Sequence, residues 1–503
     1  MGAFENNKEP RMKKFLVAFF VIFISLIFVL TLKGNYGNPT SSQIYNEQKV
    51  MGQPFELSPE RGRYALTMSL AQDHSFFLRQ DIAKIVTPDL GFFSGKYTLL
   101  VSPGMSILGV PFYLLGAPFN LAQVSTFAMP AFFAVLNFLL ILKICQQLKI
   151  SFKASIVGGL SYLFATTSFA YSVSYYQHQL TTFLLLSTAA LLFSKRNVIR
   201  LGIAAFLVGL SFWIDSQNPI FFIPLIFYAV QTVIKVQRDS RYTKIFFQAR
   251  FLLAVLGIVL ALGAYSLYSL TVFNKPFQLA GTLTSVKDFD QNNAPIIKTL
   301  STQKNTSRFF NTRRMGHGFA TLVFSEDRGF IYYAPIVIVA VLGIGELIRR
   351  RYEQSVALIG TVLFIFVLYT MWGDPYGGWA FGPRYLVPIF AFAAIFISEA
   401  VDLFRKKIWF NLMLFGLFCY GASVNLLGAI TTNQVPPQVE AVALGMKWNY
   451  MLNWDVFQKG VTSSFFYNTY LDHLLTLNVF YLVILVSIIA VFGFTLFSLE
   501  RNK

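Results

Sequence analysis

Short loops rich in Lys and Arg alternate with long apolar stretches along nearly the whole of this chain. Seven basic segments contain more than half of its 41 Lys and Arg residues: the N-terminus to Lys14; Lys143, Lys149 and Lys153; Lys195, Arg196 and Arg200; Lys235 through Arg250; Arg349, Arg350 and Arg351; Arg405, Lys406 and Lys407; and Arg501 with Lys503. Basic residues beside membrane spans concentrate on the cytoplasmic side. If all seven segments lie in the cytoplasm, an even number of crossings must separate each from the next.

The apolar stretches between these segments predict twelve crossings, with both termini in the cytoplasm. A soluble globule of 503 residues, 55% of them hydrophobic, could not keep so much apolar surface out of water. We interpret the first stretch as a retained helix, because no small-residue cleavage site follows it as in a secretory signal. The expected spans are about 15–32, 125–142, 154–173, 177–194, 198–214, 218–235, 250–273, 331–347, 355–372, 385–404, 409–429 and 476–498.

One further apolar stretch, about 99–119, would make the number of crossings odd and invert every later loop. Pro103, Pro111 and Pro118 interrupt its backbone hydrogen bonding, and its glycines weaken a helix. We therefore expect this stretch to lie along the outer membrane surface or to enter the membrane only partway.

The predicted fold is an all-α, polytopic membrane domain over residues 1–503, with about twelve transmembrane helices. Three large segments lie on the expected outer face: 33–124, which carries amphipathic surface helices, 274–330 and 430–475. The formal charge of +18 follows from the basic inner loops, so it does not indicate a nucleic-acid partner. The distribution predicts a multi-pass protein of the cell membrane whose chemistry faces outward.

Neither a disulfide framework nor a metal site is predicted. The two cysteines, Cys145 and Cys419, lie far apart in apolar surroundings and are expected to be packing residues. No spacing of His, Asp or Glu matches a zinc site, and no Gly-rich loop precedes a cytoplasmic helix as in nucleotide-binding folds.

The first outer segment contains an expected helix that begins at residues 58–59, where a proline follows a serine. Its apolar residues, including Tyr64, suit an amphipathic helix with one face on lipid. Glu60 then lies in the first turn, close to the bilayer surface and beside Arg61 and Arg63. From the local sequence alone, a capping carboxylate in a solvated ion pair fits this pattern better than a catalytic acid does.

Four later motifs accompany this helix in a fixed order. They are Gly95-Lys96-Tyr97 followed by the Pro-Gly-x-Ser run at Pro103; Tyr175-Tyr176-Gln177-His178; Glu326-Asp327-Arg328-Gly329-Phe330; and the glycine-rich turn from Trp372 to Tyr385, which ends Gly382-Pro383-Arg384-Tyr385. Together they resemble the GT-C superfamily of polytopic glycosyltransferases, and more narrowly its bacterial dolichyl-phosphate-mannose-type and aminoarabinose-type transferases.

The resemblance implies an enzyme that takes a sugar from a polyprenyl-phosphate carrier and passes it, with inversion, to an acceptor outside the cytoplasm. A carboxylate that accepts the proton of the acceptor hydroxyl makes that hydroxyl a better nucleophile. The departing lipid phosphate gains negative charge, so fixed cations near it stabilise the transition state. The site therefore needs an acidic residue and one or more Arg or Lys residues at headgroup depth.

Glu60 matches by position the acidic residue that the family places in this loop, which implies that Glu60 is the base. The family often presents an Asp-Glu pair close after the first helix, whereas here a single Glu follows about 28 residues beyond Leu32. Asp73, Asp81 and Asp89 therefore stay open as alternatives. The neighbours Arg61, Arg63 and Tyr64 are candidate substrate-binding residues.

Arg384 is the leading candidate for binding the carrier phosphate, followed by Lys96 and Arg328. A guanidinium can bind two phosphate oxygens at once, and a lone Arg on an outer turn runs against the cytoplasmic bias of basic residues. The other interpretation is a membrane-interface anchor packed on Trp379 and Tyr385. These two aromatic residues belong to the interfacial belt by default and are also candidates for stacking on a sugar face of the substrate.

Three weaker candidates complete the predicted site. Asp374 either orients Arg384 or a sugar hydroxyl, or terminates the preceding helix. His178 either hydrogen-bonds a phosphate or belongs to the interfacial aromatic belt. His317, after two arginines, fits a solvated outer loop better than a phosphate contact.

Two other functions share parts of this pattern. A transporter or flippase of lipid-linked glycans would also need basic and aromatic residues near headgroups, but it predicts polar residues across the bilayer midplane, and the spans carry few. A ligase or polymerase of lipid-linked glycans would share the site chemistry. The resemblance leaves a divalent ion, the sugar, the carrier length and the acceptor open.

Overall fold

The computed structural model describes residues 8–194, 197–238, 243–247, 250–297 and 310–498. Its helices are α1 (Lys8–Thr31), α2 (Ser41–Glu47), α3 (Ser58–Gln72), α4 (Gln80–Lys84), α5 (Gly104–Gly116), α6 (Ala122–Gln147), α7 (Phe152–Phe164), α8 (Ser168–Ser172), α9 (His178–Phe193), α10 (Val198–Ile214), α11 (Asn218–Phe221), α12 (Ile223–Val233), α13 (Arg250–Phe273), α14 (Met315–Phe324), α15 (Phe330–Tyr333), α16 (Ala340–Arg350), α17 (Tyr352–Thr370), α18 (Val387–Phe404), α19 (Ile408–Ile430), α20 (Gln438–Leu444), α21 (Tyr450–Gln458) and α22 (Leu477–Phe497). Its strands are β1 (Leu90–Phe93), β2 (Lys96–Leu99), β3 (Ile234–Arg238), β4 (Thr243–Phe247), β5 (Thr284–Phe289) and β6 (Pro295–Ile297). The chain is mostly helical, but an all-α description omits these strands.

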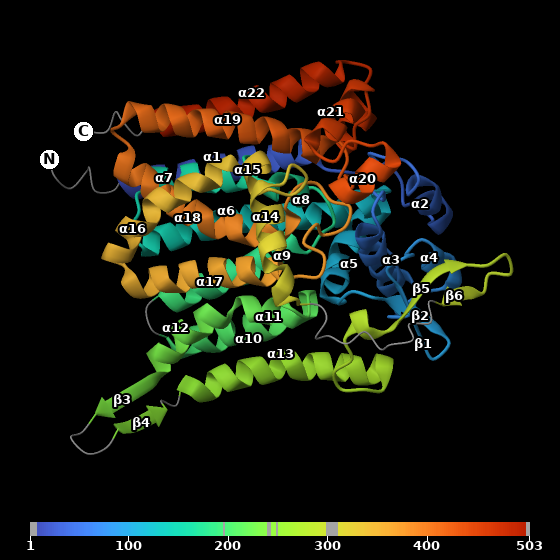
Figure 1. Cartoon of the computed structure of the whole chain (residues 1–503), viewed down its shortest axis with the longest axis horizontal. Coiled ribbons are helices and arrows are strands. Elements are labelled where there is room, and N and C mark those ends of the chain that lie inside the picture. Colours follow the sequence, from blue (N-terminus) through green and yellow to red (C-terminus); the bar gives the residue numbers. More distant parts are fainter. Residues whose placement is uncertain (1–7, 195–196, 239–242, 248–249, 298–309, 499–503) are drawn as a thin grey trace.

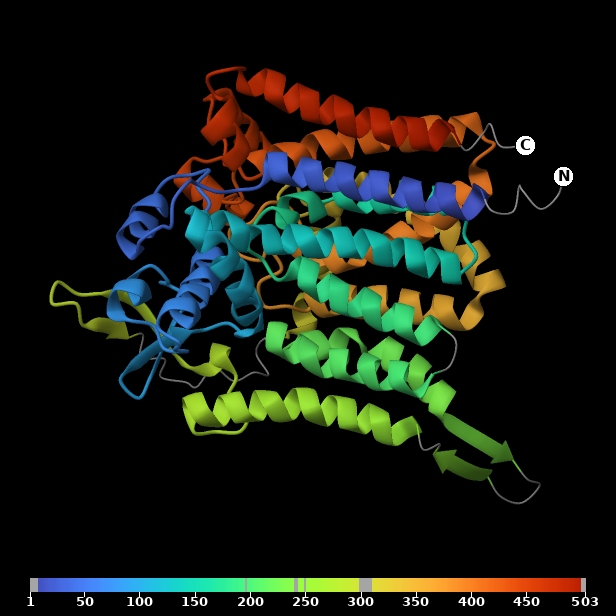
Figure 2. The ribbon, with the colours of Figure 1, turned by 180° about the vertical axis from the view of Figure 1, so that it is seen from behind.

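The long helices lie side by side, with α19 and α22 at one edge of the array and α10 and α13 at the other (Figures 1 and 2). The start of α1, the end of α22 and the β3–β4 hairpin share one end of the array. The opposite end, called the loop end below, carries α2 to α5, the strands β1, β2, β5 and β6, and the helices α20 and α21 (Figure 1). The large segments 33–124 and 430–475 therefore meet at the loop end.

Seven of the described helices are long and apolar enough to cross a membrane, as expected of a multi-pass membrane protein. They are the helical stretches Met12–Thr31, Ala122–Gln147, Phe251–Phe273, Tyr352–Thr370, Arg384–Phe404, Ile408–Ile430 and Leu477–Phe497. The other expected spans fold as shorter or consecutive helices: α7 with α8, α9, α10, α11 with α12, and α15 to α16. The number of twelve crossings stays a prediction.

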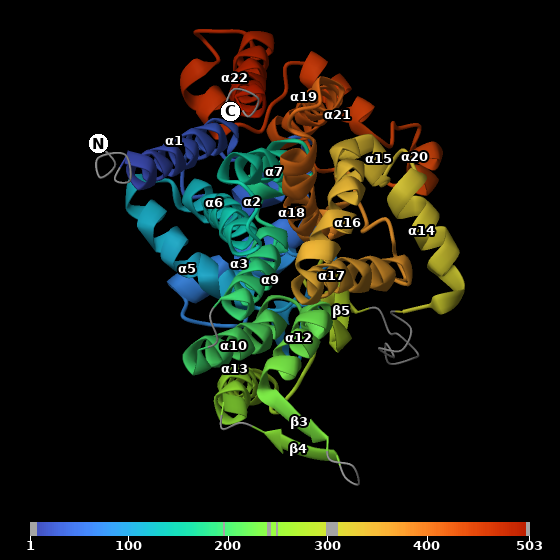
Figure 3. The same cartoon turned by 90° about the vertical axis from the view of Figure 1, so that its left-hand side faces the viewer.

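Helix α18 forms the centre of the array and is 89% buried over its apolar window (Figure 3). It packs against α7, α9, α16 and α17. Glycines permit the closest of these contacts, because a Cβ at Gly158 of α7 or Gly343 of α16 would meet the backbone of α18. The segment just before α18, which carries Arg384, is therefore attached to a rigid core.

Helix α3 is present where the sequence predicts it, but it does not place one face on lipid. Ten consecutive residues, 60–69, are buried. The reason is that α5 and β2 pack against α3, and Thr67 Oγ1 bonds Ser106 at its carbonyl oxygen (3.1 Å) and Tyr175 at its hydroxyl (3.0 Å). The charged residues at the start of α3 thus lie inside the loop end and not at a lipid surface.

The strands β1, β2, β5 and β6 connect two loop segments that are far apart in sequence. The four-stranded antiparallel sheet has the order β2-β1-β5-β6, with Leu90 opposite Val286. Beside it, Val272 and Phe273 at the end of α13 form an apolar cluster with Leu283. This cluster fixes the outer edge of α13 to the segment that follows α3.

Candidate active site

Glu60 lies in the first turn of α3 and is only 1% exposed. Its Oε1 atom is buried without a hydrogen-bond partner. Burial raises the pKa of Glu60 to about 8, an effect that Lys33 opposes and Glu56 reinforces. A buried carboxyl oxygen without a hydrogen bond is costly, and such groups concentrate at functional sites.

Lys33 and Glu56 lie near Glu60, and neither residue is predicted from the sequence. Glu56 is fully engaged: it accepts from Gly52 N (2.7 Å), Thr432 Oγ1 (2.6 Å) and Asn433 N (2.6 Å). Lys33 Nζ lies 3.8 Å from Glu56 Oε1, and burial lowers the pKa of Lys33. The hydrogen bonds of Glu56 therefore join the loop at Gly52 to residues 432–433. Glu60 Oε1, by contrast, has no protein partner and is free to accept a proton. A lone Lys just after the first span was the signal that could have identified Lys33.

Two guanidinium groups approach the ring of Tyr176, which follows α8. The carbon Cζ of Arg63 lies 5.7 Å from the ring centroid and that of Arg384 lies 5.4 Å from it. Arg63 donates to Pro59 O (3.1 Å), and Arg384 Nε is buried without a hydrogen-bond partner. Burial lowers the pKa of Arg63, and the charge of Arg384 adds to this effect. Two guanidinium groups therefore contact the same ring.

Two cavities meet at Arg384. The first, called the Arg63 cavity, has a volume of about 520 Å³ and is lined by Arg63, Tyr176 and Asp215 among others. The second, called the Trp379 cavity, has a volume of about 410 Å³ and is lined by Glu56, Asp374 and Trp379 among others. Both cavities share the wall residues Pro59, Asp89, Arg384 and Tyr385.

Glu60 lines neither cavity, although the residue before it lines both. It lies close enough to Tyr176 for its charge to raise the pKa of that hydroxyl, after the larger effect of burial. Glu60 therefore lies one residue from the wall that the two cavities share.

Asp215, after α10, is a second carboxyl group of the Arg63 cavity that the sequence analysis did not select. Burial raises its pKa, and Arg63 opposes this most strongly. Gln217 Nε2 lies 3.4 Å from Asp215 Oδ2. The unusually polar turn at 215–219 was the signal in the sequence.

Two of the predicted binding arginines hold backbone in place. Arg61 donates to the carbonyl oxygens of Phe55, Glu56, Ile85 and Thr87 at 2.8–3.2 Å. Arg328 is 1% exposed and donates to those of Asp327, Tyr376, Gly378 and Val435 at 2.7–3.0 Å. Since their donors are used, these two arginines position the loops around the cavities.

The glycine-rich turn before α18 presents the remaining predicted residues. Asp374 accepts from the backbone N–H groups of Tyr376 (3.1 Å) and Gly378 (2.7 Å), so it shapes the turn. Trp379 Nε1 donates to Glu440 Oε2 (2.6 Å). The ring of Tyr385 stacks on that of Tyr369, with centroids 4.4 Å apart. The turn thereby aims Arg384 at the two cavities.

Tyr64 and His178 pack behind the arginine pair. The ring of His178 stacks on that of Tyr176, with centroids 5.8 Å apart, and its Nε2 atom is buried without a partner. Tyr64 is fully buried, and its ring contacts those of Phe55 and Tyr113. Neither residue lines the Arg63 cavity or the Trp379 cavity.

Of the alternative acids, Asp89 alone lines these two cavities, where it accepts from Ser58 Oγ (2.7 Å). Asp73 is paired with Arg79 (3.2 Å) at the other end of α3, about 20 Å along the helix axis from Glu60. Asp81 accepts from Ser41 Oγ (3.0 Å) in a separate surface groove. The structure therefore does not bring Asp73 or Asp81 to Arg384.

Lys96 and His317 also lie away from the cavities. Lys96 is exposed at the start of β2, with Nζ 4.7 Å from the ring centroid of Phe77. His317 is exposed and its Nε2 lies 3.1 Å from the hydroxyl of Tyr376. Among the residues that the structure describes, no group of three His, Cys, Asp or Glu side chains could hold a metal ion.

A scan against protein-family models finds no match, and no curated protein matches the chain. Solved structures do. The crystal structure of ArnT from Cupriavidus metallidurans bound to undecaprenyl phosphate matches with a TM-score of 0.51 at 14% identity, over 97% of this chain and 77% of ArnT. ArnT in the apo state matches with a TM-score of 0.51 at 13% identity, over 96% of this chain and 77% of ArnT.

The archaeal oligosaccharyltransferase AglB from Archaeoglobus fulgidus, in complex with an inhibitory peptide and a dolichol-phosphate, has a TM-score of 0.49 at 14% identity, over 86% of this chain and 58% of AglB. The likeness to ArnT confirms the fold that the resemblance of the motifs implies. The chain thus has the fold of ArnT and the apolar helices of a multi-pass membrane protein.

Proposed function

We propose that this protein is an inverting glycosyltransferase that moves a sugar from a polyprenyl-phosphate carrier to an acceptor on the outer side of the cytoplasmic membrane. The observation that carries the proposal is the pair of guanidinium groups, Arg63 and Arg384, on one ring beside a cavity. Among the described residues, no ion pair includes either of them. A phosphate between them would relieve their mutual repulsion.

In the proposed reaction the acceptor hydroxyl attacks the anomeric carbon of the sugar. The bond between that carbon and the phosphate oxygen breaks, and the carrier phosphate leaves with the electron pair. Glu60 accepts the proton of the hydroxyl. Arg63 and Arg384 bind the leaving phosphate more tightly as its charge grows, which lowers the barrier.

The two cavities supply separate approaches for the two substrates. The Arg63 cavity holds both guanidinium groups and adjoins the end of α10, which suits the headgroup of a lipid donor. The Trp379 cavity is lined by an indole, three acidic residues and Gln434, which suit a hydroxylated acceptor. Substrates that reach Arg384 from two separate cavities fit an attack from the side opposite to the leaving group, which produces inversion.

The pKa of Glu60 fits the role of a base. A general base works best when its pKa is near the operating pH, and burial raises the pKa of Glu60 to about 8. The neighbouring charge of Lys33 stabilises the ionised form that accepts the proton.

A direct assay tests the proposal. Purified protein in nanodiscs is supplied with undecaprenyl-phosphate-linked hexoses and pentoses, and with membranes from cells that lack the gene as the source of acceptor. We expect at least one donor to lose its sugar and release undecaprenyl phosphate, with Glu60→Gln inactive. Movement of intact lipid-linked sugar across a liposome bilayer, without release of the carrier, would instead identify a transporter.

A further inference from the structure

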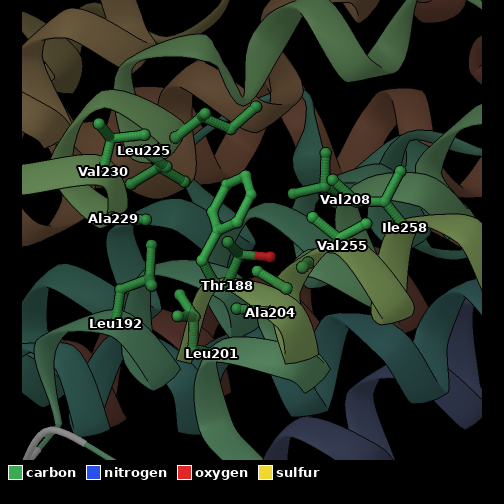
Figure 4. Close-up of a pocket in the computed structure, with 14 residues that line it drawn as sticks. Thr188, Leu192, Leu201, Ala204, Val208, Leu225, Ala229, Val230, Val255 and Ile258 are labelled. Carbon is green, nitrogen blue, oxygen red and sulfur yellow. The ribbon is translucent and has the colours of Figure 1, made fainter. Parts of the chain in front are cut away.

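A third cavity, of about 260 Å³, lies among α9, α10, α12 and α13, away from the candidate active site (Figure 4). Its lining includes Leu192, Leu201, Ala204, Val208 and Ala229. Apart from Thr188, every lining residue is Ala, Val, Leu, Ile or Phe. Water would not be stable in such a space, whereas an apolar chain would be. We call it the α10 cavity.

The α10 cavity opens sideways toward the surface of the helical array. Helix α13 packs against α10, while α12 packs against α9 and α17. Five lining residues are exposed by 36–43%: Ile226 and Val230 of α12, and Phe251, Val255 and Ile258 of α13. In a membrane this opening would face lipid, so a hydrocarbon chain could enter from the bilayer.

Helix α10 joins this cavity to the candidate active site. The end of α10, at Phe212 and Ile214, lines the Arg63 cavity, and residues 201–208 of the same helix line the α10 cavity. At 1.5 Å per residue, the α10 cavity lies about 9–20 Å below Ile214 along the helix axis. A lipid with its phosphate at Arg63 and Arg384 would therefore extend its tail along α10 into this cavity.

We infer that the α10 cavity is a binding site for the isoprenoid tail of the donor carrier, and that it selects carriers long enough to reach it. The inference rests on the proposed function, because it takes the headgroup position from the Arg63 cavity. A tail of only two isoprene units would stop short of the α10 cavity, whereas a long polyprenyl tail would fill it.

Filling the cavity with a larger side chain tests this length selection. Ala204→Phe on α10 and Ala229→Phe on α12 place a ring in the cavity from two sides, and Ile203→Phe places the same ring on the exposed face of α10. We expect the first two variants to raise KM at least tenfold for an undecaprenyl-phosphate-linked donor, with no change for a geranyl-phosphate-linked donor. The Ile203→Phe variant should match wild type with both donors. An equal effect on both donors, or none, would overturn the inference.

Photo-crosslinking separates this inference from the proposed enzyme activity. Undecaprenyl phosphate with a photoreactive group on its tail is irradiated with wild-type protein in nanodiscs, and labelled peptides are mapped by mass spectrometry. We expect labelling of α10, α12 or α13 that Ala229→Phe removes and Ile203→Phe preserves. Labelling confined to other helices refutes the tail site, even if sugar transfer is observed. The tail site is also refuted if a photoreactive phospholipid labels the same helices and undecaprenyl phosphate does not displace it.

Discussion

Replacing Glu60 by Gln should lower activity and raise stability in the same protein. The substitution keeps the size of the side chain and removes the group that accepts the proton. Proton transfer by a positioned side chain contributes about 10²–10⁴-fold to rate, so turnover should fall by that factor. In wild type, kcat/KM should rise about tenfold per pH unit up to about pH 8, the pKa to which burial raises Glu60, and then level off.

The effect on stability follows from the same pKa. Below pH 4.5, the ordinary pKa of the group, Glu60 is protonated in both the folded and the unfolded chain. Between pH 4.5 and about 8 the unfolded chain loses this proton and the folded chain keeps it, so the free energy of unfolding falls as pH rises. At 1.36 kcal/mol per pH unit the cost reaches at most roughly 5 kcal/mol above pH 8.

Glu60→Gln removes this cost, because the amide stays neutral at every pH. We expect its thermal unfolding midpoint, followed by tryptophan fluorescence in detergent, to equal that of wild type at pH 4.5 and to exceed it at pH 8.5. Asp89→Asn is the matched control, since Asp89 is the alternative acid that lines both cavities. Normal turnover by Glu60→Gln, with an inactive Asp89→Asn, would assign the base to Asp89. A Glu60→Gln protein that is less stable at both pH values would refute the account of an unsatisfied buried carboxyl group.

Three further substitutions probe the residues around Glu60. Arg384→Ala should raise KM for the lipid donor about 10–100-fold, since hydrogen bonds to charged groups contribute about 1.5–3 kcal/mol. Arg384→Lys should recover part of this loss. An unchanged KM in donor titrations would exclude phosphate binding by Arg384. Lys33→Met removes the cation that most favours ionised Glu60, so the rising limb of the pH–rate profile should move to higher pH; a shift to lower pH would contradict the electrostatic argument. Arg328→Gln should lower the thermal unfolding midpoint, because each buried carbonyl oxygen left without a donor costs about 1–3 kcal/mol. Arg313→Gln, at an exposed position, should leave the midpoint unchanged. Equal midpoints for the two variants would show that Arg328 does not hold the turn before α18.

The apolar and basic pattern predicted most of the helical architecture, because hydrophobic length and flanking charge are local properties of the sequence. The helix from Ser58 and the helix after Arg384 are both present. The burial of α3 was not predictable in this way, since it depends on contacts with α5 and with β2. The pairing of β1 with β5 joins residues almost two hundred positions apart, which no local pattern indicates.

The candidate site was predicted where a residue's role depends on a motif and missed where it depends on burial. Arg384 was selected from its turn and does lie between the two cavities. Arg328 looks equivalent in sequence, yet four backbone carbonyl groups use its donors. Lys33 and Glu56 carry no motif, and only the folded chain brings them to Glu60.

A structure of the protein with a bound polyprenyl-phosphate sugar, determined by cryo-electron microscopy in nanodiscs, tests the central claim most directly. The account predicts the phosphate within hydrogen-bond distance of the guanidinium groups of Arg63 and Arg384. It also predicts that the anomeric carbon of the sugar lies between the bound phosphate and Glu60. The account would be contradicted by a phosphate bound elsewhere, for example beside Lys96 at the exposed start of β2. In that case Arg384 would still contact Tyr176 and would not touch the ligand.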